Sequence, residues 1–520
     1  MIAAALLTTL AFAPSQLLSL DSALQNVRTA LRTDLAAGLD HDVRAEGKVM
    51  FYGEKGTYEL LFSPAGAFAE RIDSPLGVSR GFDGMIAWEA DWSGATRTLA
   101  LKDRELTLAQ MAINSGAWLD PKSMFGITID AKGTTGQTLK LELTVRGGKH
   151  KVWIDVDRKS WLPQRTVHID SAGEAITTFA DWRLTEAGQM PFTVTSSEGG
   201  LTNTVTLTKV ERAPTFIRSP YSKPPWSPID TRFDPSAPAA VEMKRTFTGH
   251  ILVHPLVDGK DVGWFILDSG AGTMVIDPKL ADAQKMPQIG EIPVVGVGGV
   301  IKGHFRTSKS FTLGSMTVTD LKFVEIDLEQ ISRIFQTKVA GIAGYDIFRR
   351  AVVSLDLQAK TLAIEEPSKH RLASGKWLPL QLDGKHPIIE ATYEGNRAGM
   401  FRIDTGAQGT VTFGGDLARE LVKNRETTPL MLGGVGGMIQ AKQGALSSFT
   451  LAGHRFEAPE ATFMTSEGNA LANDFLAGNI GQDFLMPFQL VFDYGSDRIA
   501  FVPHGRKVPD ASWPSPLLRR

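Results

Sequence analysis

Apolar and polar residues alternate along most of residues 20–212, which is the pattern of β-strands with one buried face. Residues 22–37 instead repeat their apolar positions at helical spacing and predict an amphipathic helix, and residues 106–113 predict a second helix. The predicted strands cover residues 48–52, 58–62, 68–72, 86–90, 96–101, 139–145, 151–156, 164–169, 176–182 and 204–210. A helix followed by a curling antiparallel sheet leaves an apolar concave face, so we expect an α+β antiparallel half-barrel here.

The second half of the chain contains apolar strands that end twice on the same motif. The two copies are Asp268-Ser269-Gly270-Ala271 and Asp404-Thr405-Gly406-Ala407. A glycine-rich segment and then a further glycine follow each copy at nearly equal distances. These positions are Gly296, Val297, Gly298, Gly299 and Gly344 after the first copy, and Gly434, Val435, Gly436, Gly437 and Gly481 after the second. Such a repeat marks a duplicated unit, and we place its copies at residues 241–372 and 373–508.

The repeated aspartate indicates the chemistry. Asp268 and Asp404 each close an apolar strand, where an unpaired carboxylate is costly. Two carboxylates in contact cannot both ionise, so they share a proton and supply an acid and a base together. A single Asp-Thr-Gly is usually a surface turn, and a glycine-rich hairpin alone is only a tight turn. The recurrence of both in the same order favours a paired site.

The residues beside the aspartates fit this interpretation. Gly270 and Gly406 are expected where the backbone turns tightly. The hydroxyls of Ser269 and Thr405 can form hydrogen bonds across a lobe interface, and the alanines that follow the glycines are small enough for two loops to pack closely.

This set of spaced elements resembles the retropepsin-like aspartic proteases. The resemblance implies a mainly β fold, with two retropepsin-like β-barrel lobes forming a pepsin-like bilobal unit. It also implies that Asp268 and Asp404 form the catalytic pair across a pseudo-twofold axis, and that the two glycine-rich hairpins are flaps over an extended polypeptide substrate. Two departures concern the substrate: Gly272 and Gln408 stand where retroviral enzymes usually have aspartate, and neither hairpin has the tyrosine of pepsin-like flaps.

Composition narrows the function further. The net charge of −2 and the absence of Lys/Arg runs argue against a nucleic-acid partner. The chain has no cysteine, and its ten histidines lack metal-ligand spacing, so we expect neither a metal nor another cofactor.

The ends and the middle of the chain have their own patterns. Residues 1–19 read as a secretory signal or an N-terminal apolar segment, which predicts a periplasmic or secreted protein. Residues 213–240 contain seven prolines and predict an extended linker, or a strap along the second half. Residues 509–520 form a short tail.

Residues 82–88, 152–155 and 161–163 loosely resemble segments of periplasmic lipoprotein-carrier-like domains. The resemblance implies that the half-barrel holds a hydrophobic ligand or a peptide. The alternative is that its aromatic residues only fill a core.

The sequence therefore predicts a monomeric aspartic endopeptidase preceded by a half-barrel domain. One alternative is the same fold without catalysis, acting as a peptide- or lipid-binding protein. Another is a protease that is active only as a homodimer, with equivalent lobes of two chains paired.

Overall fold

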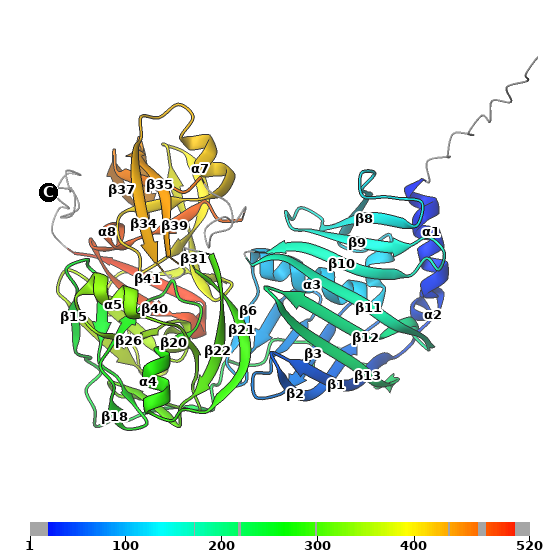
Figure 1. Cartoon of the computed structure of the whole chain (residues 1–520), viewed down its shortest axis with the longest axis horizontal. Helices are drawn as coiled ribbons and strands as arrows, with labels where there is room; N and C mark the ends of the chain where they lie inside the picture. The colour runs from blue at the N-terminus through cyan, green and yellow to red at the C-terminus, as the bar shows by residue number, and fades with distance from the viewer. Residues whose placement is uncertain are drawn as a thin grey trace, which may run out of the picture.

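The computed structural model describes residues 19–170, 172–216, 220–296, 299–434, 437–465 and 475–504 (Figure 1). The predicted signal segment, apart from Ser19, and the predicted tail lie outside the described residues. The fold is mainly β, as expected, with a curved sheet beside a two-lobed unit. Among the described helices, none is long and apolar enough to cross a membrane.

The N-terminal part is one 13-stranded sheet in the order β6-β5-β4-β3-β2-β1-β13-β12-β11-β10-β9-β8-β7. Its strands are β1 Asp42–Phe51, β2 Glu54–Phe62, β3 Phe68–Asp73, β4 Ser79–Phe82, β5 Ala87–Ala90, β6 Thr96–Thr98, β7 Phe125–Ile129, β8 Thr138–Val145, β9 Lys151–Asp157, β10 Pro163–Asp170, β11 Gly173–Thr185, β12 Gly188–Glu198 and β13 Leu201–Ala213. The helical segments are α1 Leu20–Leu31, α2 Thr33–Ala37, α3 Leu101–Ser115 and the 3-10 turn η1 Ala117–Leu119. The strands β4, β7 and β12 were not predicted, because they are short or lack strict alternation.

Alternating burial explains how the half-barrel forms its core. In β8, Leu139, Leu141 and Leu143 are buried while the residues between them are partly exposed. These side chains pack in one cluster with α1 and α3 on the concave face (Figure 1). Such burial of whole apolar side chains is worth roughly 2 kcal/mol each.

Two predicted boundaries in this part are wrong. The single helix expected over residues 22–37 is divided at Arg32, whose φ of 56° ends α1 in a left-handed cap. The strand expected over residues 96–101 stops at Thr98, because Leu101 begins α3. Apolar alternation persists across both boundaries, so periodicity alone could not place them.

The first lobe contains two sheets. The larger has the order β15-β16-β19-β26-β20-β25-β22-β21 and the smaller the order β14-β24-β23-β17-β18. Their bounds are β14 Thr231–Phe233, β15 Met243–Arg245, β16 Ile251–Val253, β17 Leu256–Val257, β18 Lys260–Asp261, β19 Trp264–Leu267, β20 Met274–Ile276, β21 Gln288–Gly296, β22 Gly299–Thr307, β23 Ser310–Leu313, β24 Met316–Thr319, β25 Lys322–Glu325 and β26 Val339–Ala343. The helices are α4 Pro278–Ala283, α5 Glu329–Phe335 and α6 Tyr345–Phe348.

The second lobe repeats this arrangement in a ten-stranded sheet, in which β34-β35-β38-β33-β39-β32-β31-β36-β37 are consecutive and β30 pairs with β31. Its strands are β30 Gln381–Asp383, β31 His386–Tyr393, β32 Arg397–Ile403, β33 Val411–Phe413, β34 Thr428–Gly434, β35 Gly437–Ala445, β36 Ser448–Leu451, β37 His454–Glu457, β38 Glu460–Phe463 and β39 Gly478–Ile480, with helices α7 Gly415–Leu421 and α8 Gln482–Leu485. The parallel pair β32–β39 corresponds to β19–β26 in the first lobe. The two lobes therefore share one topology.

A five-stranded sheet joins the lobes in the order β28-β27-β40-β41-β29. Its strands are β27 Val352–Asp356, β28 Thr361–Glu365, β29 Trp377–Pro379, β40 Phe488–Asp493 and β41 Arg498–Pro503, and the 3-10 turn η2 Tyr494–Ser496 links the last two of these in sequence. Because β27 pairs antiparallel with β40, the terminal hairpins of the two repeats lie side by side in one sheet.

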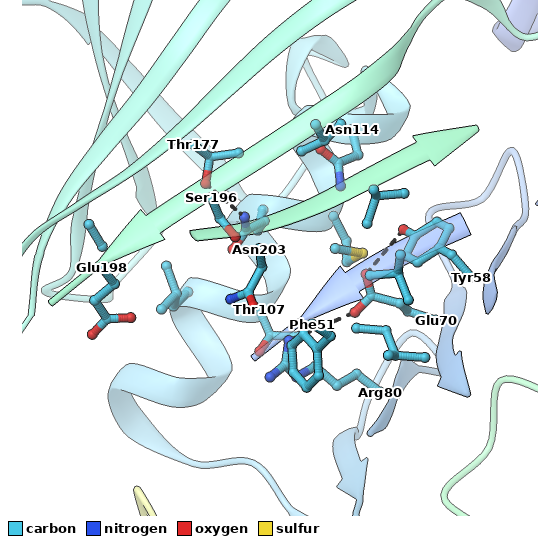
Figure 2. Close-up of a pocket in the computed structure, with 18 of the residues that line it drawn as sticks. Phe51, Tyr58, Glu70, Arg80, Thr107, Asn114, Thr177, Ser196, Glu198 and Asn203 are labelled. Carbon is cyan, nitrogen blue, oxygen red and sulfur yellow. Dashed lines mark hydrogen bonds and ion pairs between the residues drawn. The ribbon is translucent and has the colours of Figure 1, made fainter. Parts of the chain in front are cut away.

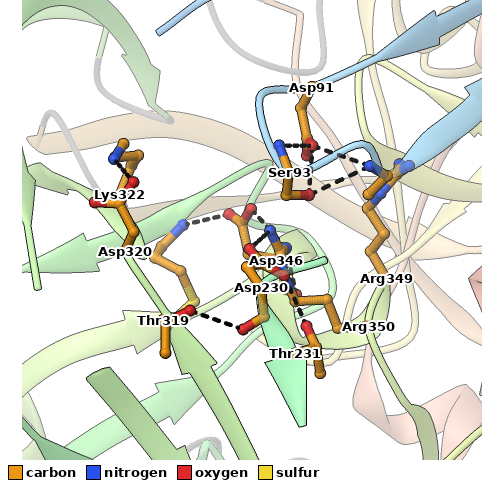
Figure 3. Close-up of polar contacts among 12 residues, drawn as sticks. Asp91, Ser93, Asp230, Thr231, Thr319, Asp320, Lys322, Asp346, Arg349 and Arg350 are labelled. Atoms are coloured by element: carbon orange, nitrogen blue, oxygen red, sulfur yellow. Dashed lines mark hydrogen bonds and ion pairs between the residues drawn. The ribbon is translucent and has the colours of Figure 1, made fainter. Parts of the chain in front are cut away.

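The proline-rich segment also contributes to the first lobe. Its strand β14 pairs with β24, and Asp230 just before it binds Arg350 (Figure 3). The Arg350 Nη2 atom lies 2.7 Å from Asp230 Oδ2, and its Nη1 atom lies 3.2 Å from Asp346 Oδ1. The Arg350 side chain is fully buried, and its contacts with these two side chains compensate its charge.

The half-barrel contacts the β21–β22 hairpin of the first lobe. The Glu291 N–H donates to the Tyr52 carbonyl at 2.9 Å, and the Gly290 N–H donates to Glu54 Oε1 at the same distance. The rings of Tyr52 and Phe305 lie 6.1 Å apart. One of the two glycine-tipped hairpins is therefore fastened to the N-terminal domain.

Candidate active site

The two motif aspartates occupy equivalent positions in the two lobes. Asp268 follows β19, and its N–H donates to the Ala343 carbonyl at 3.0 Å. Asp404 follows β32, and its N–H donates to the Ile480 carbonyl at 3.0 Å. Each aspartate therefore leaves a parallel strand pair at the same point, which fixes where its loop begins.

The two motif loops interlock through four hydrogen bonds. The hydroxyl of Ser269 donates to the Ile403 carbonyl at 2.8 Å, and that of Thr405 donates to the Leu267 carbonyl at 3.2 Å. Each hydroxyl also accepts the other residue's backbone N–H, at 2.9 and 3.0 Å. Both residues are fully buried. This reciprocal arrangement holds the loops rigidly across the lobe interface.

Glycine follows each motif hydroxyl residue because the opposite carboxyl group lies close. A Cβ atom at Gly270 would lie 2.4 Å from Asp404 Cγ, and one at Gly406 would lie 2.3 Å from Asp268 Cγ. Neither glycine has a positive φ. The reason expected from the sequence, a turn conformation that favours glycine, is therefore wrong, and space is the reason.

The hydrogen bonds to the two carboxyl groups differ. The Gly270 N–H donates to Asp268 Oδ1 at 2.7 Å, and the Gly406 N–H donates to Asp404 Oδ1 at 2.9 Å. The side-chain amide of Asn479 adds a further donor at 2.8 Å from Asp404 Oδ2. Asn479 was not singled out in the sequence, because its counterpart in the first repeat is Ile342.

Burial raises the pKa of Asp268 well above its usual range, and the neighbouring carboxyl of Asp404 adds to the rise. The hydrogen bond from Gly270 and the charge of Arg402 oppose it. The raised pKa of Asp268 means that the pair retains a proton as a unit, so it can offer an acid and a base at once.

Two histidines that the sequence analysis missed lie beside the motif loops. Burial lowers the pKa of His250 to about 4, although the charge of Asp404 and the Gly406 backbone oppose this shift. Burial also lowers the pKa of His386 well below its usual range, and its Nε2 would lie 3.4 Å from a Cβ atom at Gly272. Each histidine precedes its aspartate by the same number of residues, so the repeat held a signal for both.

The later motif glycines lie where short helices pack on the motif loops. A Cβ at Gly344 would lie 2.5 Å from the Ala271 carbonyl oxygen, and one at Gly481 would lie 2.6 Å from that of Gly409. The next residues donate to the motif alanines: Tyr345 N–H to Ala271 at 2.9 Å and Gln482 N–H to Ala407 at 3.0 Å. These hydrogen bonds attach each motif loop to the short helix that follows the glycine.

The glycine-rich segments form antiparallel hairpins. The last pairs are Gly296 with Gly299 in β21–β22 and Gly434 with Gly437 in β34–β35. Val297, Gly298, Val435 and Gly436 lie outside the described residues. We call these hairpins the first and second flap.

The described part of the chain holds no group of three or more histidine, aspartate or glutamate residues placed to bind a metal ion.

Asp383, near the site, gives a pH-dependent prediction. Burial raises its pKa to about 6, with help from Asp103 and against the charge of Arg402. In the unfolded chain an aspartate has a pKa of about 3.9, so between these values the folded chain binds more protons. Stability should then fall as the pH rises from about 4 to 6. Asp383→Asn is expected to remove this part of the fall, about 2–3 kcal/mol.

Thermal melting tests this prediction. The difference in stability between wild type and Asp383→Asn is measured at pH 4 and at pH 7, and it should change between the two. Asp416→Asn, at an exposed aspartate, serves as a control. Its difference in stability from wild type should be the same at both pH values. An equal difference for Asp383→Asn at both pH values would contradict the prediction.

Comparison with known proteins agrees with the repeat. Residues 253–347 and 389–484 each match the family model described as aspartyl protease. Each matched segment contains one motif aspartate, one flap and one of the supporting glycines. No curated protein matches the chain. The C-terminal region therefore holds two segments that match the aspartyl protease family, one in each retropepsin-like lobe.

Proposed function

We propose that the C-terminal region is an aspartic endopeptidase that hydrolyses peptide bonds with Asp268 and Asp404 of a single chain. The observation that carries this proposal is the reciprocal interlock of the two motif loops, which sets each carboxyl group against the glycine of the other loop. A binding protein has no evident need for two carboxyl groups that share a proton in a partly buried place.

The proposed reaction uses the two carboxyl groups in different roles. Asp404, with donors at both oxygens, acts as the carboxylate that takes a proton from water. Protonated Asp268 donates its proton to the carbonyl oxygen of the scissile bond while the water oxygen attacks the carbonyl carbon. The resulting tetrahedral intermediate collapses when the C–N bond breaks and the leaving nitrogen receives the proton from Asp404. As the carbonyl group forms again, a hydroxyl group of the intermediate gives its proton to Asp268. Both carboxyl groups are then back in their starting protonation states.

The substrate is a polypeptide in extended form. Each flap is a two-stranded hairpin with a glycine-rich sequence between its strands, and this construction suits segments that close over a bound peptide. No cofactor is required by the proposed steps.

Mass-spectrometric profiling of a diverse peptide library, from about pH 3 to 8, tests the proposal, since this range brackets the titration of a coupled carboxyl pair. Cleavage at defined sequence positions is expected. A folded protein that cleaves nothing in this range would favour the alternative of a catalytically idle binding protein.

The pairing of both motif loops within one chain supports a monomeric enzyme over one that needs two chains. Gel filtration combined with activity measurement separates these possibilities. Activity that falls with dilution, together with elution as a dimer, would favour the homodimer.

We propose a second function for the half-barrel, the binding of a small hydrophobic ligand. The observation in its favour is a cavity of about 310 Å³ inside the curved sheet (Figure 2). Phe51, Leu60 and Met111 are among the apolar residues that line it. Polar residues line it as well, including Glu70, Arg80, Asn114, Thr177, Ser196, Glu198 and Asn203. Met111→Trp should fill the cavity and abolish binding of a fluorescent fatty-acid probe. The exposed Ile169→Trp should leave it unchanged, and equal binding by both variants would contradict the proposal.

A further inference from the structure

Four polar residues replace four apolar ones on corresponding faces of the two lobes. In the second lobe, Arg402 pairs with Asn479, Asn479 with Thr412, and Thr412 with Thr462 across adjacent strands. The same register in the first lobe pairs Ile266 with Ile342, Ile342 with Val275, and Val275 with Val324. A complete exchange of this kind at one face indicates a role that the two lobes do not share.

This polar face borders the catalytic pair. Asn479 Nδ2 lies 2.8 Å from Asp404 Oδ2, and the charge of Arg402 acts on both motif aspartates. The neighbours of Arg402 on its strand, Phe401 and Ile403, are fully buried in the lobe core, so Arg402 projects from the opposite side of the sheet. A side chain of a peptide held at the pair would meet this face.

Two buried polar atoms on the face have no hydrogen-bond partner. They are Arg402 Nε, a donor, and Asn479 Oδ1, an acceptor. Arg402 is 8% exposed and Asn479 is 4% exposed, so water compensates little. An unsatisfied buried polar group costs free energy, and a ligand that pairs both atoms would recover it.

The two faces also differ in how closely they are covered. Ile266, Ile342 and Val275 are 4–5% exposed and pack in a continuous apolar cluster with other residues of the chain. Thr412 and Thr462 are only partly buried. The polar face is therefore more accessible at Thr412 and Thr462, whereas Arg402 and Asn479 are about as buried as their apolar counterparts.

We propose that this face is a subsite for a carboxamide side chain, glutamine or asparagine, next to the scissile bond; the proposal rests on the endopeptidase function. The carboxamide oxygen accepts from Arg402 Nε–H, and its NH2 group donates to Asn479 Oδ1. A carboxylate cannot donate to Asn479 and meets the negative charge shared by the catalytic pair. An apolar side chain leaves both atoms unpaired.

Matched peptides that carry glutamine or methionine at each position flanking the scissile bond test the subsite, since these side chains have similar length. Wild type is expected to favour glutamine at one position by about tenfold or more in kcat/KM. Arg402→Met should remove this preference, and Asn479→Ile, which copies Ile342 of the first lobe, should weaken it independently. Ile266→Met on the other face should leave the glutamine-to-methionine ratio unchanged.

A role of Arg402 limited to the electrostatics of the pair predicts a different result. Arg402→Met would then slow both peptides equally and shift the pH profile, with the ratio intact, and this outcome overturns the subsite.

Binding to the Asp268→Asn variant separates the subsite from the endopeptidase function. Fluorescence anisotropy should show tighter binding of the glutamine peptide than of the methionine peptide, with the difference lost when Arg402→Met is added. This result without cleavage by wild type would overturn the endopeptidase and support the subsite. Cleavage by wild type with no glutamine preference would overturn the subsite alone.

Discussion

Asp404→Asn is expected to reduce peptide cleavage by about a thousandfold or more and to leave the fold intact. The amide cannot take a proton from water, and general acid–base groups of this kind contribute about 10²–10⁴ in rate. Asp268→Asn should have a comparable effect, because an amide has no acidic proton for the scissile carbonyl. The two losses should not add, since both residues act on the same water and the same bond.

Cleavage of one peptide by wild type, both single variants and the double variant measures this effect, with circular dichroism to verify folding. Asp416→Asn is the matched control, because Asp416 is an exposed aspartate of the second lobe that pairs with the partly exposed Arg419. Its activity should equal that of wild type. Retained cleavage by either active-site variant would remove that aspartate from the reaction.

Gly406→Ala is expected to lower activity about a hundredfold and to destabilise the protein by about 1–3 kcal/mol. The added methyl group would lie 2.3 Å from Asp268 Cγ, a separation that no side chain tolerates, so the carboxyl group or the loop must move. Gly270→Ala should act in the same way, with the methyl group 2.4 Å from Asp404 Cγ. Because the interlocked hydroxyls hold both loops, neither can shift without loss of those hydrogen bonds.

Gly136→Ala provides the control for the glycine variants. Nothing lies within 4 Å of a Cβ at Gly136, and its φ is not positive. This variant should keep full activity and gain a few tenths of a kcal/mol from reduced chain entropy. Kinetics and thermal melting of all three variants test the predicted losses of activity and stability. Normal activity in Gly406→Ala would show that the carboxyl groups are not held as closely as the structure places them.

The repeat made the duplicated lobes predictable, because it consists of several spaced elements in the same order. Four hydrogen bonds between the motif loops could not be derived, since they join residues that only the folded interface brings together. His250 and His386 were accessible in principle through their equal distance from the aspartates. They were missed because isolated histidines are common in cores.

Asn479 and Arg402 were missed for a different reason. Sequence comparison of the repeats draws attention to what is identical, whereas these residues differ from Ile342 and Ile266 at the same register. Their significance depends on which side chains face the carboxyl pair, and this requires the strand pairing. The division of the first helix at Arg32 likewise depends on a backbone conformation that apolar periodicity does not report.

The sheet that joins the lobes bears on how the chain can be divided. In the whole chain β27 pairs with β40, and Val353 and Leu355 on β27 are fully buried. A fragment that ended at residue 372 would leave the N–H and C=O groups of this apolar strand open at a sheet edge. Such edges recruit strands from other molecules. The first lobe on its own would therefore be an aggregation-prone fragment, and the lobes must be produced together to remain soluble.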